Sequence, residues 1–202
     1  LMIRDRKMNI KVSGRENLPI IVFLHGFTGS VSTWDEVRME LEDCFRIIAI
    51  DLTGHGKTAI PNDASCYEMA VQLADLEALF AELNITDFTL VGYSMGGRIA
   101  LAYTKEYPER VKTLILESAS PGLKTEAERA LRMAADLKLA KRIEVEGIDR
   151  FVDFWENIPL FDSQKKLSIA QQQKIREERL SQNETGLSCS LKGIGTGKQP
   201  SY

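Results

Sequence analysis

The chain has 202 residues, of which 44% are hydrophobic and 27% charged, with a formal net charge of -3 and a pI near 5.6. A chain of this length buries about 70% of its unfolded surface, enough for one sizeable core with an insertion or for two small domains. The acidic balance argues against nucleic acid or an anionic membrane surface as the main partner.

The cysteines and the N-terminal residues bear on the compartment. Cys44, Cys66 and Cys189 are an odd number without C-x-x-C spacing, which argues against a disulfide framework and a zinc site and suits a reducing cytoplasm. Residues 1–7 lack the apolar segment of a secretory signal, and no apolar run is long enough to span a bilayer. We therefore expect a soluble cytoplasmic protein with no bound metal and no membrane span.

The first part of the chain alternates between short apolar runs and longer amphipathic segments. Residues 19–24, PIIVFL, form a continuous apolar run, as expected for a strand that is covered on both faces of a parallel sheet. Ser32 and Thr33 are candidate helix caps. The pattern predicts strands over residues 7–12, 19–24, 45–50, 88–91 and 111–116, and helices over 34–41, 67–83 and 95–106. Strands that alternate with helices at this spacing indicate a mostly parallel, doubly wound α/β sheet.

The pattern changes after residue 122. Thr125 and Glu128 have the spacing of a capping box and predict a helix that continues to residue 143. Two more helices are predicted over residues 149–155 and 164–180, a loop over 192–200, and no strand anywhere after residue 122. We expect a core over residues 1–122 and a helical cap over 123–202 that ends with the start of a return to the core. Such a cap, laid over the strand ends, would enclose a partly dry pocket.

A serine lies at the junction of a predicted strand and helix, in the segment GYSMG at residues 92–96. This pattern is typical of a nucleophile elbow, in which glycines two before and two after the serine avoid collisions with the neighbouring strand and helix. The elbow predicts that the Ser94 hydroxyl stands above the sheet edge. It also leaves the Met95 N–H, at the helix N-terminus, free to bind a developing oxyanion.

Activation of Ser94 requires an imidazole that takes its proton and a carboxylate that orients the imidazole. The chain has two histidines, both before Ser94, whereas a fold with this elbow orders its triad as serine, acid, histidine. We interpret His25 as shaping the loop whose Phe27 N–H is the second oxyanion donor, and His55 as a structural loop residue. The acid and the histidine are expected after residue 202, in two further βα units of about 30 residues each. Glu117 is the nearby carboxylate that could replace the acid, although a structural bond to the cap is the favoured interpretation.

Arg98 follows Ser94 by four residues, so the two side chains share one helix face. A guanidinium beside a covered pocket is costly unless it meets a carboxylate. From this residue alone, a substrate carboxylate and a glutamate of the cap are equally good partners. Arg129, Arg132 and Arg179 are further candidates for a carboxylate clamp, and each is also explained as a solvated helix charge.

Five segments together resemble one enzyme family. They are HGFTGS (25–30), DLTGHG (51–56), GYSMGGRIAL (92–101), ESASPGL (117–123) and a tail that runs from RLSQN (179–183) to GIGTGKQP (193–200). The first two segments are shared widely, whereas the tyrosine before the serine, the arginine four after it and the tail are more specific. The whole chain resembles the 2-succinyl-6-hydroxy-2,4-cyclohexadiene-1-carboxylate synthases of bacterial menaquinone biosynthesis, which belong to the α/β-hydrolase superfamily.

The resemblance implies an α/β-hydrolase fold with a helical cap, whose last βα units are missing from this chain. It implies a lyase that eliminates pyruvate from 2-succinyl-5-enolpyruvyl-6-hydroxy-3-cyclohexene-1-carboxylate, a small anionic dicarboxylate substrate, without a metal or an organic cofactor. In this interpretation Ser94 abstracts a proton and the amides of Phe27 and Met95 stabilise the oxyanion. The substrate-binding residues implied are Arg98, Tyr93, His25, Arg129 or Arg132, Trp155 and Arg179.

Two alternatives remain open from the sequence. One is a general carboxylester or C–C bond hydrolase, which would turn over neutral esters without help from Arg98. The other is an inactive fragment that lacks the triad acid and histidine and exposes a sheet edge at residues 111–116. Nothing in the sequence specifies an oligomeric state.

Overall fold

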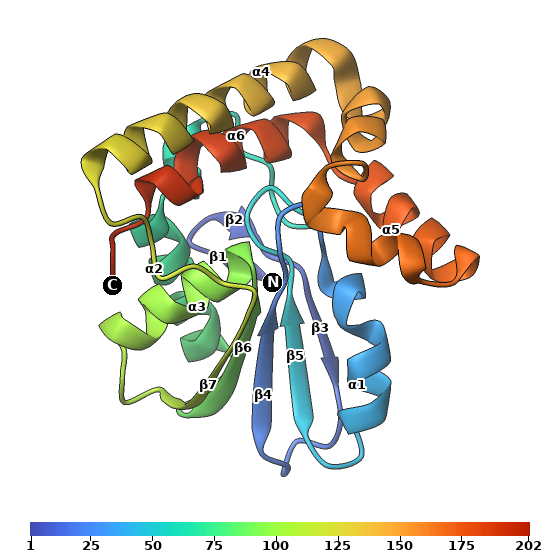
Figure 1. Cartoon of the computed structure of the whole chain (residues 1–202). Coiled ribbons are helices and arrows are strands. Elements are labelled where there is room, and N and C mark those ends of the chain that lie inside the picture. The colour runs from blue at the N-terminus through green and yellow to red at the C-terminus, as the bar shows by residue number, and fades with distance from the viewer.

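The computed structural model describes residues 1–202, and its centre is a five-stranded sheet (Figure 1). The sheet has the order β3-β5-β4-β6-β7, in which β3 is antiparallel to β5 and the other neighbours are parallel. This arrangement confirms the mostly parallel α/β sheet. A separate hairpin of β1 and β2 precedes it. The strands are β1 (Met2–Ile3), β2 (Arg6–Lys7), β3 (Ile10–Ser13), β4 (Ile20–Leu24), β5 (Arg46–Ile50), β6 (Phe88–Tyr93) and β7 (Val111–Glu117).

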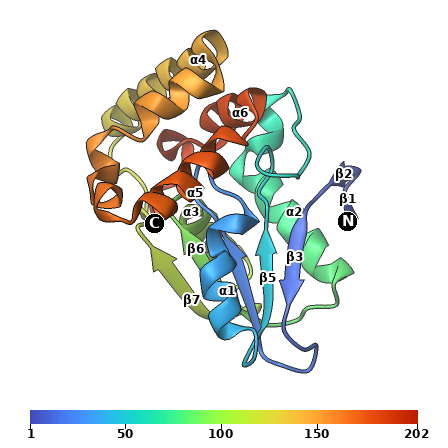
Figure 2. The same ribbon diagram turned by 90° about the vertical axis from the view of Figure 1, so that its right-hand side faces the viewer.

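Helices lie on both faces of the sheet, and a second group of helices lies over its upper edge (Figure 2). The helix α1 covers one face, and α2 and α3 cover the other (Figure 1). The α-helices are α1 (Asp35–Leu41), α2 (Met69–Glu82), α3 (Met95–Glu106), α4 (Glu126–Trp155), α5 (Ile169–Leu180) and α6 (Glu184–Ile194). The short 3-10 helices are η1 (Val31–Trp34), η2 (Ala64–Tyr67), η3 (Pro159–Lys166) and η4 (Thr196–Lys198).

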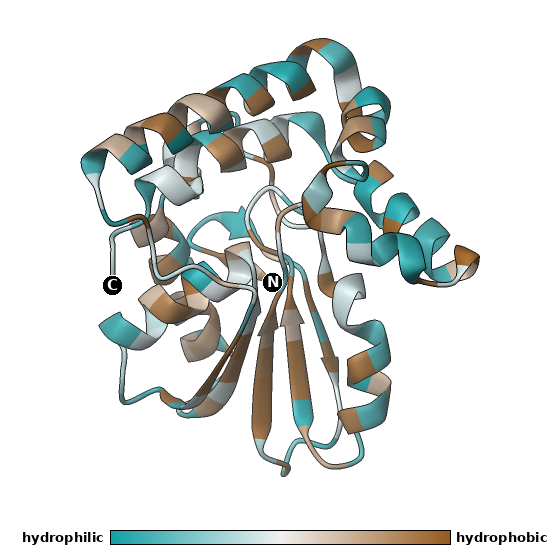
Figure 3. Ribbon diagram, viewed as in Figure 1, coloured by the Kyte–Doolittle hydropathy of each residue, from teal (hydrophilic) through white to brown (hydrophobic).

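The central strands divide their side chains between two cores. Successive residues of a strand point to opposite faces, so in β4 Val22 packs with α2 and α3, whereas Phe23 packs with Trp34 beside α1. Val22 and Phe23 are both buried, as a strand covered on two faces requires. Figure 3 shows the resulting concentration of hydrophobic residues along the central strands and a largely hydrophilic α5. The core therefore holds the ends of β4 and β6 rigidly at the upper edge.

Residues 123–202, called the cap below, contain α4, α5 and α6 and no strand, as the sequence predicted. The capping box at Thr125 is confirmed, because its hydroxyl accepts from the Glu128 N–H and the Glu128 side chain bonds back to the Thr125 N–H. The two helices predicted over 125–143 and 149–155 form one element, α4, which is kinked at Gly147, where φ is 79°. The division into two domains stays a prediction.

The sequence did not predict the helix α6. The loop predicted over residues 192–200 was wrong for its first residues, which belong to this helix. Glycines concealed the helix, yet two of them are required where α6 packs closely on backbone. A Cβ on Gly186 would lie 2.0 Å from the Gly54 oxygen, and one on Gly193 would lie 2.3 Å from the Ala64 oxygen. A glycine-rich segment is therefore a tightly packed helix here rather than a loop.

Three other boundaries differ from the prediction. The strand predicted over 7–12 is split at residues 8–9, where the Asn9 N–H donates to the Thr58 hydroxyl instead of a strand neighbour. The N-cap residue of the first helical segment is Ser30 rather than Ser32 or Thr33. Thr33 occupies the N3 position of the same capping box. The helix predicted over 164–180 begins at residue 169, after a cap at Ser168.

Candidate active site

The elbow, residues 92–96, has the predicted strand-turn-helix geometry. Ser94 lies between β6 and α3 with φ 51° and ψ -109°, a conformation that is strained for a residue with a side chain. Its N–H donates to the Glu117 oxygen of β7 at 2.9 Å, which ties the turn to the neighbouring strand. The Ser94 side chain does not cap α3 and faces the cavity described below. The strained backbone thus presents a free hydroxyl.

The elbow glycines are required by close backbone contacts. A Cβ on Gly92 would lie 2.5 Å from the Gly96 oxygen, and a Cβ on Gly96 would lie 2.3 Å from the Leu24 oxygen at the end of β4. Real Cβ atoms do not approach other atoms this closely, so no larger residue fits without a shift of the backbone. The tight turn and the close packing of α3 on the sheet both depend on these positions.

The loop at residues 25–29, called the oxyanion loop below, approaches the elbow from β4. A Cβ on Gly26 would lie 2.8 Å from the Tyr93 ring and 3.4 Å from the Ser94 Cβ, so only glycine allows this approach. The Phe27 N–H donates no hydrogen bond within the chain. The Met95 N–H, at the first position of α3, has no acceptor within its helix. Two backbone donors are therefore free beside one serine hydroxyl.

Both histidines are buried, His25 as the first residue of the oxyanion loop and His55 packed against His25 and Phe27. The Nε2 atom of His25 accepts from the Leu52 N–H at 3.0 Å, so its Nδ1–H donates to the Gly26 oxygen at 2.8 Å. Burial lowers the pKa of His25 to about 4 and, with the neighbouring His25 ring, that of His55 to about 3. His25 does not line the cavity and has no ring nitrogen left for a substrate. Its ring holds the oxyanion loop in place.

A cavity of about 740 Å³ lies between the elbow and the cap. Its wall contains eight of the residues predicted from the sequence, from both the core and the cap. They are Phe27, Tyr93, Ser94, Met95, Arg98, Arg132, Trp155 and Arg179. The cavity therefore brings the serine, both backbone donors and three arginines to one space.

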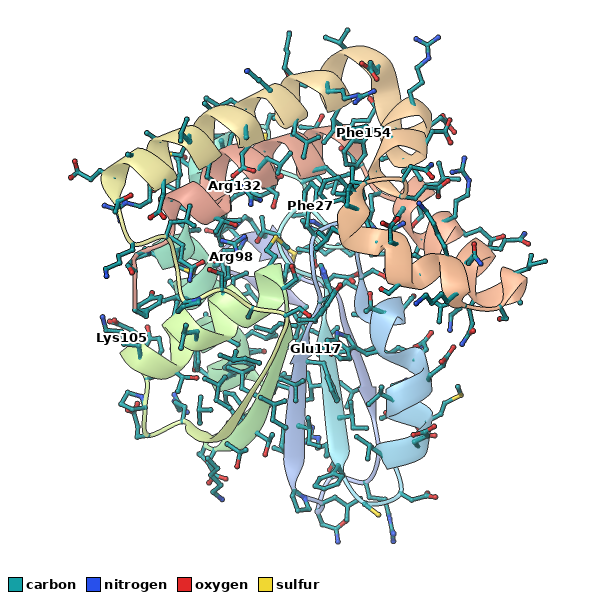
Figure 4. All side chains as sticks on the ribbon, in the orientation of Figure 1. Phe27, Arg98, Lys105, Glu117, Arg132 and Phe154 are labelled. Carbon is teal, nitrogen blue, oxygen red and sulfur yellow. The ribbon has the colours of Figure 1, made fainter.

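Arg98 rises from α3 toward Arg132 of α4 (Figure 4). Its side chain is buried, and one Nη atom donates to the Ile194 oxygen at 2.7 Å. Burial and the nearby Arg132 charge lower the pKa of Arg98 to about 10, so it stays charged at neutral pH. Arg129 lies outside the cavity wall, and its guanidinium donates to the Leu123 and Lys124 oxygens.

Arg179 occupies another part of the cavity wall, on α5. It is buried, donates to the Gln164 side chain at 2.9 Å and lies over the Phe161 ring at 4.4 Å. Burial lowers its pKa, and the neighbouring charges of Glu156 and Glu178 oppose this shift. No carboxylate within the chain forms an ion pair with Arg179. Its charge is available to an anion in the cavity.

Aromatic side chains line the remainder of the cavity. Trp155 stacks on Phe151 with ring centroids 5.5 Å apart and meets Phe27 edge to face at 5.6 Å. The Trp155 indole N–H is buried without a partner. Burial and the Glu117 charge raise the pKa of Tyr93, and the Arg179 charge acts in the opposite direction. Phe27, Tyr93 and Trp155 thus form an aromatic part of the cavity wall that contains Ser94.

Glu117 ends β7 and lines the cavity, as its position at a strand end suggested (Figure 4). Its carboxylate takes part in none of the ion pairs of the chain, so the predicted bond to the cap is not made.

Sequence reasoning also missed three polar residues in or beside the site: Asp136, Gln164 and Ser190. Only Asp136 had a signal, because it follows Arg132 by four residues on a predicted helix.

The chain has no group of three or more His, Cys, Asp or Glu side chains arranged to hold a metal ion. None of its helices combines the length and the apolar character that crossing a membrane requires.

Comparison with known families places these features in context. A family model described as alpha/beta hydrolase fold matches residues 19–165. The solved structure of MenH from S. aureus superposes with a TM-score of 0.89 and 36% identity, covering 96% of this chain and 73% of that one. The superposition includes the elbow and the cap, because almost the whole chain is covered.

Two sequence relatives are named alike. A putative 2-succinyl-6-hydroxy-2,4-cyclohexadiene-1-carboxylate synthase from Bacillus subtilis is 48% identical over 181 residues, covering 90% of this chain and 66% of the relative. A 2-succinyl-6-hydroxy-2,4-cyclohexadiene-1-carboxylate synthase from Salmonella typhimurium is 34% identical over 188 residues, covering 93% of this chain and 71% of the relative. The chain thus spans about two thirds of the length of these relatives.

Proposed function

Since this chain belongs to the α/β-hydrolase fold family, and within it to the 2-succinyl-6-hydroxy-2,4-cyclohexadiene-1-carboxylate synthases, we propose that its cavity binds a multiply anionic cyclohexene carboxylate and serves the elimination of pyruvate. The substrate would be 2-succinyl-5-enolpyruvyl-6-hydroxy-3-cyclohexene-1-carboxylate, converted in menaquinone biosynthesis. A cytoplasmic location is part of the same proposal.

The chemistry follows from the structures of substrate and product. A base removes the proton at C2, which lies next to the succinyl ketone, and the electron pair forms a C2–C3 double bond. The C3–C4 double bond moves to C4–C5, and the C5–O bond breaks. The departing enolpyruvate takes up a proton and becomes pyruvate. Proton and leaving group balance without an oxidant, a reductant or a second substrate.

Ser94 is the proposed base, because its hydroxyl is the reactive group that the strained elbow holds at the cavity. When the C2 proton leaves, negative charge develops on the oxygen of the succinyl ketone. The free N–H groups of Phe27 and Met95 are suited to that oxyanion, since preorganised backbone donors stabilise such charge in a water-poor site. One such donor contributes about 3 to 4 kcal/mol in acyl-transfer enzymes.

The observation that carries the proposal is the set of guanidiniums beside Ser94. Arg98, Arg132 and Arg179 all line the same cavity, and Arg98 and Arg179 are buried. Arg132 is paired with Asp136, but Arg98 and Arg179 are buried without an ion pair in the chain, which is unfavourable unless anions enter the pocket. A substrate with several carboxylates supplies those anions, whereas a neutral ester does not.

Pyruvate release from the enolpyruvyl substrate, coupled to lactate dehydrogenase, tests the proposal. Arg98→Ala is expected to raise KM by at least about tenfold, the size of one charge-assisted contact. Arg150→Ala is the matched control, because Arg150 is an exposed arginine of α4 away from the cavity. Absence of pyruvate, together with an Arg98 variant that behaves as the wild type, would contradict the proposal.

A general esterase is the second candidate, because a free serine hydroxyl with two backbone donors also suits acyl transfer. It predicts turnover of short neutral esters at rates that Arg98→Ala does not change.

The third candidate is a chain without full activity. The two histidines, His25 and His55, bond to neighbouring loop backbone, and neither activates Ser94. Without an activating partner, the oxyanion donors and binding alone leave about 10³ to 10⁴-fold acceleration over water. Pyruvate release by the 202-residue chain at a rate typical of enzymes would exclude this candidate.

A further inference from the structure

Asp136 lies on α4, one turn after Arg132, and is almost completely buried. Its Oδ1 atom accepts from the Arg132 Nε at 2.8 Å, and its side chain is 5% exposed. Its Oδ2 atom is also buried but has no hydrogen-bond partner. Oδ2 lies against Gly195, where a Cβ would be only 2.4 Å away. A carboxylate that served structure alone would be expected to use both oxygens.

The third member of the group is Arg98, which reaches the same place from α3. Its guanidinium donates to the Ile194 oxygen, and Ile194 is the neighbour of the Gly195 that Asp136 contacts. Arg98 and Asp136 therefore meet at the C-terminal end of α6. The Asp136 charge raises the pKa of Arg98, and the Arg132 charge lowers it. We call Arg98, Arg132 and Asp136 the anion subsite.

The two arginines of this subsite differ in their freedom to move. Arg98 is 7% exposed and bonded to a helix end, whereas the Arg132 side chain is 47% exposed and keeps only its bond to Asp136. Two guanidiniums that face each other repel. If the carboxylate were neutral, Arg132 would turn into solvent, because that movement is open to it and not to Arg98.

We propose that Asp136 is a positioning residue, which holds the Arg132 guanidinium beside Arg98 so that the two present a single carboxylate-binding subsite of net charge +1 to the cavity. Asp136 does not line the cavity and so acts through the arginines. The proposed function supplies the identity of the incoming carboxylate, and the geometry of the subsite does not depend on it.

The other cavity arginine supports this role by contrast. Arg179 stands without a second guanidinium beside it, and its partners are the neutral side chains of Gln164 and Phe161. The cap thus uses a carboxylate where two guanidiniums meet and a neutral amide where one stands alone.

Asp136→Asn is the direct test, because asparagine has the same size and no charge. In the pyruvate assay we expect KM to rise about tenfold, as for the loss of one charge-assisted contact, with kcat changed by less than about twofold. Glu146→Gln is the matched control. Glu146 accepts from the Nε of Arg142, also four residues earlier on α4, at 2.9 Å, and neither residue lines the cavity. This control is expected to leave KM and kcat unchanged.

A double variant separates positioning from general damage. Arg132→Gln should raise KM, and Asp136→Asn added to it should raise KM no further, because the aspartate acts through that arginine. If Asp136→Asn does not fold, Arg132→Lys tests the same contact, since lysine keeps the charge but lacks the Nε–H. An unchanged or lower KM in Asp136→Asn, or full additivity in the double variant, would overturn the proposal.

Binding of succinate, measured by calorimetry, keeps this inference separate from the proposed function. We expect the succinate dissociation constant to rise about tenfold in Asp136→Asn and to stay unchanged in Glu146→Gln. The same pair of results in a protein that releases no pyruvate would refute the proposed reaction and support the subsite. Equal succinate binding by Asp136→Asn and the wild type would overturn the subsite whatever the assay shows.

Discussion

The two walls of the cavity are built by different means. On the core side, the position of Ser94 follows from backbone contacts, because Gly92 and Gly96 leave no space for a side chain between β6, α3 and β4. On the cap side, each arginine is held by one partner side chain, Arg132 by Asp136 and Arg179 by Gln164. The free Ser94 hydroxyl lies on the wall built from backbone contacts, and Arg132 and Arg179 lie on the wall built from side-chain pairs.

This difference has consequences for what substitutions do. A backbone-built feature fails abruptly, since any added atom displaces a strand or a helix. In a feature built from side-chain pairs, each substitution removes the free energy of one contact. Such a pair can be replaced without disturbing the fold. Substitutions at the backbone-built positions should therefore affect rate or folding strongly, and substitutions in the side-chain pairs should affect affinity in smaller steps.

The largest expected effect separates two hydroxyls that face the same cavity. Ser94→Ala should lower kcat/KM about 10³-fold, as expected for loss of a general base. Ser190, on α6, donates to the Met95 sulfur at 3.5 Å, and Ser190→Ala should lower kcat/KM by less than about tenfold, the value of one neutral hydrogen bond. The pyruvate assay measures both. Comparable losses would remove the distinction between the two walls.

Two glycines extend the comparison to stability. Gly96→Ala places a Cβ 2.3 Å from the Leu24 oxygen and 2.5 Å from the His25 oxygen, so we expect a loss of about 3 kcal/mol or more. Gly147, at the kink of α4, has φ 79°. A Cβ at this position would meet only a side-chain oxygen of Glu184, at 3.2 Å. Gly147→Ala should therefore cost less, about 1 to 3 kcal/mol, the strain of a side chain at φ 79° and ψ 172°, a region that only glycine adopts readily. Urea unfolding gives both values, and the reverse order would contradict the comparison.

Acid should weaken the core side through its two buried histidines. The pKa of His25 is lowered to about 4 and that of His55 to about 3, so between these values and pH 6.5 the unfolded chain binds more protons than the folded one. Stability contributed by the neutral rings is complete above pH 6.5 and is lost as the pH falls toward 4. Each ring that is protonated only in the unfolded chain lowers the stability by about 1.4 kcal/mol for each pH unit of that interval.

Urea unfolding at a series of pH values measures this loss. His55→Gln removes one titrating ring and should reduce the slope of stability against pH in that interval. A slope that the substitution leaves unchanged would show that other groups cause the acid sensitivity.

The same difference between the walls explains what the sequence could predict. The elbow, the oxyanion loop and the buried strands depend on local patterns, GYSMG, HGFTG and continuous apolar runs, so they were placed correctly. The contacts that shape the cap, within it and between it and the core, join separate segments of the chain. The pairing of Gln164 with Arg179, and the approach of Gly193 to the Ala64 oxygen, leave no trace in any single segment.

Long-range packing also explains where the prediction from the sequence was wrong. Glycine normally disfavours a helix, yet α6 contains two that its packing on backbone requires, and so tertiary contact prevailed over propensity. Arg129 and Arg132 were equivalent by spacing on one helix. The structure distinguishes them because Arg132 lines the cavity and bonds to Asp136, whereas Arg129 bonds to the backbone that precedes α4.

The smallest expected effect concerns the start of the cap. Thr125 caps α4 through the Glu128 N–H at 3.2 Å, in an exposed capping box, so Thr125→Ala should destabilise the first turn of α4 by about 1 kcal/mol. If the cap opens independently of the core, hydrogen exchange should accelerate in the first turns of α4 and not in β4 or β6. Equal acceleration in β6 would mean that cap and core unfold as one unit, and the two walls would then differ in construction but not in stability.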